Sequence, residues 1–227
     1  MANHLDLEEQ EQLDQLKHFW KQYGNLITWA LIVVLGSVAA WNGYNMWQRN
    51  QSVQAAAMYD EVEKVVRGGD LQKAERAFAD MRDRFSKAVY TQQAGLLVAK
   101  MAYEAGKMDS AKSTLSWLSD NAADKGYASV ARLRLSAVLI EGKAYDEALK
   151  LLESGIAEEF AALADDRKGD IFTLKGKKAE AKAEYQKAYK AFDEQTEYRR
   201  LVSVKLNALG FDPEADAKIA ANNEVAK

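Results

Sequence analysis

The feature that most constrains this chain is a stretch of 27 residues, from Gln22 to Gln48, that contains no charged side chain. A helix rises about 1.5 Å per residue, so roughly 20 apolar residues cross a bilayer core of about 30 Å. Aromatic residues, which favour membrane interfaces, gather near both ends of the stretch. They are Trp20, Tyr23 and Trp29 at the first end and Trp41, Tyr44 and Trp47 at the second. We therefore predict a transmembrane signal-anchor helix over residues 22–48.

Two other interpretations of this stretch fit less well. A core helix of a soluble protein that is apolar on every face needs a thick layer of protein around it. A cleaved signal peptide begins with a short basic region, whereas residues 1–21 form an acidic tail. Lys17 and Lys21 flank the first end, against Arg49 alone near the second. This bias predicts a cytoplasmic N-terminus and a C-terminal domain across the membrane, which in a Gram-negative cell means the periplasm.

Small residues mark one face of the predicted span. Gly36, Ala40 and Gly43 follow one another at helical spacing. Small side chains allow the backbones of two membrane helices to approach closely. We expect this face to be a candidate site for packing against another membrane helix.

The rest of the chain has the composition of an all-α protein. Alanine, lysine, glutamate and leucine dominate, and Pro213 is its single proline. Residues 1–48 hold five acidic and two basic side chains, so residues 49–227 carry 29 of each. A neutral domain with interspersed signs lacks the basic surface of a nucleic-acid-binding protein. We expect no nucleic-acid partner.

Four similar segments recur after the predicted span: "GGDLQKAERAF", "GKMDSAKSTL", "GKAYDEALKLL" and "GKKAEAKAEY". Each contains an alanine followed four positions later by a large apolar residue, and the alanines are 37, 37 and 33 residues apart. The pairs are Ala74 and Phe78, Ala111 and Leu115, Ala148 and Leu152, and Ala181 and Tyr185. This spacing is typical of tetratricopeptide helix hairpins, in which the alanine lies where two helices cross. We predict a tetratricopeptide-like repeat domain over residues 49–210 and a polar C-terminal tail over 211–227.

The helix boundaries follow from the same segments. The first helices of the four hairpins are expected at Ser52–Arg67, Thr91–Ala105, Tyr127–Glu141 and Phe160–Lys175, with a terminal helix at Glu197–Leu209. Four glycines are expected to end the first helices in left-handed conformation: Gly69, Gly106, Gly142 and Gly176. Asp70, Asp109 and Asp146 then stand where N-caps of the second helices are expected.

The sequence shows no pattern that points to catalysis. Cysteine is absent, and the two histidines, His4 and His18, precede the uncharged stretch. No phosphate-binding glycine loop or serine nucleophile motif occurs. Asp165, Asp166 and Asp170 could form a carboxylate site, but a solvated helix face is the better interpretation. We therefore predict no enzymatic activity, no metal and no cofactor.

A stack of helix pairs usually binds peptides on the concave face formed by its first helices. The candidate groove-binding residues on these helices are Gln92, Gln93, Tyr103, Arg132, Arg134, Arg167 and Asp170.

The chain resembles the YfgM family, the ancillary subunit of the bacterial Sec translocon. The resemblance is carried by "FWKQYGN", by "RLRLSAVLIEGKAYDEALKLLE" and by "DDRKGDIFTLKGKKAEAKAEYQKA". Its most specific part is Asp166, Arg167, Gly169, Asp170, Lys175 and Gly176. The resemblance implies an inner-membrane protein with a periplasmic tetratricopeptide-like domain. It also implies association with the translocon and with the membrane-anchored periplasmic chaperone PpiD, in the handling of newly exported client proteins.

Two other functions remain open at this stage. One is a scaffold for envelope assembly or cell division that is unrelated to export. The other is a regulator that binds a cytoplasmic protein through the acidic N-terminal tail.

Overall fold

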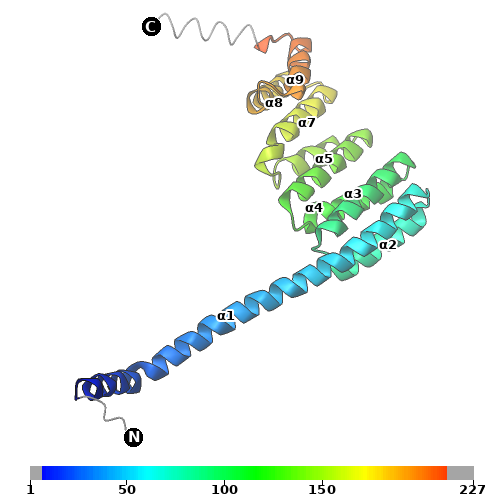
Figure 1. Ribbon diagram of the computed structural model, residues 1–227. Coiled ribbons are helices and arrows are strands. Elements are labelled where there is room, and N and C mark those ends of the chain that lie inside the picture. The colour runs from blue at the N-terminus through cyan, green and yellow to red at the C-terminus, as the bar shows by residue number, and fades with distance from the viewer. Residues whose placement is uncertain (1–6, 214–227) are drawn as a thin grey trace, which may run out of the picture. The chain divides into compact units, whose positions relative to one another are not determined.

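The computed structural model describes residues 7–213, and these form nine α-helices and one short 3-10 helix without any strand (Figure 1). The predicted all-α class is confirmed. Most of the predicted polar tail, from residue 214 onward, lies outside the described residues, as do residues 1–6.

Helix α1 (Leu7–Arg67) spans the boundary between two compact units, residues 1–51 and residues 52–227. In the first unit the large apolar side chains of the predicted span are exposed, including those of Leu26, Trp29 and Trp41. A core helix would bury such side chains, whereas these are exposed within their own unit. Within residues 7–213 this is the one helix long and apolar enough to cross a membrane.

The second unit is a series of helices in which each packs against the next (Figure 1). After the end of α1 come α2 (Leu71–Phe85), α3 (Val89–Glu104), α4 (Met108–Asn121), α5 (Lys125–Glu141), α6 (Tyr145–Leu152), the 3-10 helix η1 (Glu158–Phe160), α7 (Ala161–Leu174), α8 (Lys178–Ala191) and α9 (Glu197–Ala208). The first helices of the predicted hairpins correspond to the end of α1 and to α3, α5 and α7, and the terminal helix is α9.

The alanines and large apolar residues of the four segments lie in the core. All eight are buried: Ala74, Phe78, Ala111, Leu115, Ala148, Leu152, Ala181 and Tyr185. The ring of Phe78 also packs edge-on against Trp117 of the next hairpin, with centroids 5.6 Å apart. Each small and large pair therefore lies in contact regions where a helix crosses its neighbour, and the aromatic contact joins successive hairpins.

Three of the four glycines end their helices as expected. Gly69, Gly106 and Gly176 have positive φ angles of 76°, 70° and 72°. Gly142 does not: its φ is −74°, and Lys143 takes the left-handed conformation instead, with φ 59°. The left-handed residue lies five positions before the buried alanine in every hairpin. That position falls on Lys143 in the third, so the prediction for Gly142 was wrong by one residue.

The aspartate caps were predicted correctly only in the first hairpin. Asp70 is the N-cap of α2 and accepts a hydrogen bond from the backbone N of Lys73 at 3.0 Å. Asp109 and Asp146 lie instead in the first turns of α4 and α6, whose N-caps are Lys107 and Ala144. Carboxylates in a first turn still favour the helix dipole, although they do not cap the helix.

Candidate protein-interaction site

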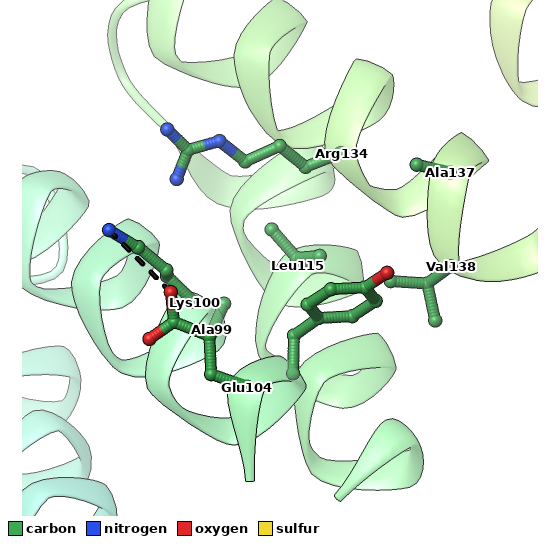
Figure 2. A pocket seen from close by; sticks show the side chains of 8 residues that line it. Ala99, Lys100, Glu104, Leu115, Arg134, Ala137 and Val138 are labelled. Atoms are coloured by element: carbon green, nitrogen blue, oxygen red, sulfur yellow. Dashed lines mark ion pairs between the residues drawn. The ribbon is translucent and has the colours of Figure 1, made fainter. Parts of the chain in front are cut away.

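A pocket of about 400 Å³ opens between α3, α4 and α5 (Figure 2). Its apolar lining comes from all three helices: Ala99 of α3, Leu115 of α4, and Ala137 and Val138 of α5. Figure 2 shows Leu115 between the helices that carry the other labelled residues. The small side chains of Ala99 and Ala137 leave the space open, because a larger residue at either position would fill it.

Charged side chains lie at the edge of this pocket. Lys100 and Glu104 form an ion pair of 3.7 Å along α3, and both side chains are mostly exposed. Arg134 on α5 extends toward the same side of the pocket as Lys100 (Figure 2). Its Nη1 donates to the carbonyl oxygen of Leu96 at 3.3 Å. The pocket thus combines an apolar interior with a basic edge, an arrangement suited to binding a peptide side chain.

Tyr103 also lines the pocket and links α3 to α5, the first helices of two successive hairpins. Its hydroxyl donates to the carboxylate of Glu141 on α5 at 2.9 Å, and 43% of the residue is exposed. The hydrogen bond to this carboxylate raises the pKa of Tyr103. Tyr103 and Arg134 are therefore the two predicted groove residues that line a pocket together.

Gln92 lies elsewhere, and its prediction as a groove residue is corrected. Its side chain is fully buried, where its Oε1 accepts from the backbone N of Asp124 at 3.3 Å and its Nε2 donates to the carbonyl of Lys87 at 3.5 Å. Buried amides need such partners. Gln92 therefore joins the start of α3 to the loop before α5 and is closed to a peptide.

Two further candidates are engaged in contacts between helices. Gln93 donates to the hydroxyl of Tyr127 at 2.7 Å. Arg132 donates to the carbonyls of Ser119 and Ser154 at 3.2 and 3.4 Å, which fastens the end of α4 and the loop after α6 to α5. These side chains hold the stack together, and Arg132 in particular is committed to backbone partners.

The three aspartates of α7 do not form a solvated face as expected. Asp166 is buried, and its carboxylate lies 2.8 Å from the ammonium of Lys205 on α9 and accepts from the hydroxyl of Tyr198 at 2.9 Å. Asp170, a candidate groove residue, accepts from Lys205 at 2.7 Å and from Tyr185 at 2.7 Å. Both carboxylates therefore anchor the terminal helix.

Sequence reasoning missed Lys205 and Tyr198, although each carries a polar group on an amphipathic helix. Asp165 of the same cluster pairs with Lys168 at 2.8 Å. Among residues 7–213 no cluster of three or more potential ligands could hold a metal ion.

The remaining candidates are Arg167 and the three small residues of the predicted span. Arg167 is half-buried on α7. Gly36 and Gly43 of the predicted span have free space beside them, because a Cβ added at either would meet nothing within 4 Å. Ala40, on the same face, is also exposed.

Comparison with known proteins agrees with this architecture. A family model described as a tetratricopeptide repeat-like domain matches residues 17–211. An ancillary SecYEG translocon subunit of Haemophilus influenzae is 30% identical over 203 residues, which is 89% of this chain and 98% of that protein. The chain belongs to the family of ancillary SecYEG translocon subunits.

Other ancillary SecYEG translocon subunits match over similar lengths. The protein from Neisseria gonorrhoeae is 29% identical over 92% of this chain and all of its own length. The protein from Escherichia coli is 24% identical over 88% of this chain and 96% of its own. No solved structure matches the chain. The family model's match, residues 17–211, includes the predicted span as well as the repeats.

Proposed function

We propose that this chain is a membrane-tethered protein-interaction module, ancillary to the Sec translocon, that aids periplasmic chaperones in handling exported proteins. The observation that carries the proposal is the match, over nearly its whole length, to proteins named ancillary SecYEG translocon subunits. Its chemistry is binding, and no step of it requires catalysis.

The apolar helix would be the tether in the bacterial inner membrane. A tether holds the repeat domain close to the export channel, which raises its effective concentration toward emerging chains. Weak contacts with each client then suffice. The small residues Gly36, Ala40 and Gly43 are exposed and would pack against the membrane subunits of the translocon.

The repeat domain would lie in the periplasm, with the N-terminus in the cytoplasm. The bases Lys17 and Lys21 before the span favour this orientation. There the domain would meet a membrane-anchored chaperone of the PpiD type and exported clients. The pocket between α3 and α5 offers such partners an apolar surface.

Site-specific crosslinking tests the association. A photoreactive residue at Ala40 should crosslink to translocon subunits in native membranes, whereas one at Val34 should do so more weakly. Val34 lies on another face of the same helix, about 9 Å along its axis from Ala40. Crosslinks to division or envelope-assembly proteins instead would contradict the proposal.

Reporter fusions test the topology. A reporter that is active only in the periplasm should be active when fused after Lys227 and inactive when fused before Met1. The opposite result would place the repeat domain in the cytoplasm and would exclude a role with periplasmic chaperones.

A further inference from the structure

We propose that the pocket between α3 and α5 binds a segment of a partner protein that carries an apolar side chain next to a carboxylate. The proposal rests on the proposed function, because it names the class of peptide that the interaction module would recognise. It follows from the lining of the pocket and from the charges at its edge.

The interior of the pocket selects an apolar side chain. Ala99, Leu115, Ala137 and Val138 supply it, and among the lining residues only those at the edge carry a charge. A polar side chain placed among these four would lose its hydrogen bonds to water without replacement. An aliphatic side chain would instead be removed from water, which is favourable.

The edge of the pocket selects a carboxylate. Among residues 7–213 no carboxylate lies within ion-pair distance of Arg134, and its guanidinium donates to a neutral backbone carbonyl, that of Leu96. Glu141, the acidic residue that ends α5, is engaged by Tyr103. Within the described part of the chain, Lys100 pairs with the exposed Glu104 of its own helix. The three charged lining residues sum to one net positive charge, so an incoming carboxylate is attracted and a lysine is repelled.

Arginine also fits this role by its shape. A guanidinium can donate two parallel hydrogen bonds to one carboxylate, which fixes direction as well as charge. Arg134 extends toward the same side as Lys100 (Figure 2), so one carboxylate there meets two bases. The apolar side chain would therefore enter between α3 and α5 while its acidic neighbour stays at the edge.

The test uses the full-length chain in lipid nanodiscs and short fluorescent peptides. The probe is a capped peptide with one leucine flanked by two aspartates in a serine and glycine background. Fluorescence anisotropy should show binding that weakens as salt rises. Replacing the leucine with serine, or both aspartates with asparagine, should each weaken binding at least fivefold.

Variants of the chain locate the site. Arg134→Glu should weaken binding at least tenfold, and a probe with lysines in place of the aspartates should then bind this variant better than the unaltered chain. Ala137→Trp should abolish binding by filling the pocket. Arg76→Glu is the matched control, because it makes the same charge change on the exposed face of α2 and should leave binding unchanged. Circular dichroism of each variant establishes that it is folded.

Several results would overturn the proposal. Binding that is equal for the leucine and serine peptides, or equal for Arg134→Glu and Arg76→Glu, would exclude the pocket. Self-association that Ala137→Trp abolishes, seen by sedimentation, would assign the pocket to a second copy of the chain. Crosslinking from Ala40 to the translocon is an independent measurement. It can succeed when the peptide test fails, or fail when the peptide test succeeds.

Discussion

The ammonium of Lys205 lies 2.8 Å from each carboxylate oxygen of Asp166, a residue that is only 1% exposed. The two residues join α9 to α7, which are separated in sequence by the whole of α8. Tyr198 adds a hydrogen bond to the same carboxylate from α9. Val202 and Leu206 of α9 are buried in the apolar cluster with α8. The terminal helix is therefore held by charge on one neighbour and by apolar packing on the other.

Removal of the ammonium should destabilise the end of the repeat domain. Lys205→Met is expected to lower the free energy of unfolding by about 3 kcal/mol, because it leaves a buried carboxylate without a counter-charge. Urea unfolding of the detergent-solubilised chain, followed by circular dichroism, measures the change. Hydrogen exchange should show faster opening of α9 than of α3.

Lys73→Met is the matched control for this prediction. Lys73 pairs with Asp70 at 3.0 Å, but its side chain is 72% exposed, and exposed ion pairs contribute about 0–1 kcal/mol. A loss for Lys205→Met no larger than that of the control would show that the buried carboxylate does not depend on its counter-charge.

The same cluster makes the stability of the repeat domain depend on pH above neutrality. Burial, followed by the nearby carboxylate of Asp166, raises the pKa of Tyr198 from its ordinary value of 10.0 to about 12. Between these values the folded chain keeps a proton that the unfolded chain has lost. The contribution to stability is therefore complete below about pH 10 and is lost as the pH rises toward about 12.

Tyr198→Phe should reduce the slope of the free energy of unfolding against pH. The free energy of unfolding of the variant should fall less steeply between about pH 10 and about pH 12 than that of the unaltered chain. The charged groups around this phenol are unchanged in the variant: Asp170, Arg167 and Lys205. The difference in slope between the variant and the unaltered chain therefore measures the contribution of the Tyr198 hydroxyl. Tyr90→Phe, at an exposed tyrosine of α3, is the control and should leave the slope as it is. Equal slopes for the two variants would contradict the assignment.

Gly169 is required by the ring of Tyr185, which lies against it in the crossing of α7 and α8. A Cβ at residue 169 would overlap the ring and would lie only 2.9 Å from its Cγ. Gly169→Ala is therefore expected to destabilise the domain by about 2 kcal/mol, as overpacked cores do. The same urea titration measures the loss.

Two comparisons sharpen this test. Tyr185→Leu combined with Gly169→Ala should cost less than the sum of the two single changes, because the smaller side chain makes room for the methyl group. Gly142→Ala is the control, since its added Cβ would lie 3.6 Å from its nearest neighbours. An additive double variant would show that the ring does not impose the glycine.

The repeats could be predicted from the sequence because their signal is local and periodic. A small residue and a large one four positions later recur at nearly constant spacing, and all eight such residues are buried. The contact between Asp166 and Lys205 has no such signal. It joins residues 39 positions apart, and which faces of α7 and α9 meet depends on how the helices between them cross.

In the candidate site, too, the sequence predicts the local features and misses those that depend on how the helices pack. Polar residues on first helices were correctly placed on those helices, but the sequence could not tell exposed from buried ones. Gln92 and Gln93 are neighbours in sequence, yet Gln92 is covered by the loop before α5 and bonds to Asp124. The pocket itself depends on three helices together. Single-helix patterns therefore indicated Tyr103 and Arg134 but not the space between them.

Lys143 offers a last test, because it is the one described residue other than glycine with a positive φ. A side chain in this conformation is strained against its own backbone, whereas glycine adopts it freely. Lys143→Gly should therefore raise the free energy of unfolding by about 1 kcal/mol, measured by urea titration. Lys112→Gly, the same replacement inside α4, should lower it by about 1 kcal/mol, since glycine weakens a helix interior. A loss of stability for Lys143→Gly would show that Gly142, rather than Lys143, takes the left-handed conformation, as the glycine pattern alone predicts.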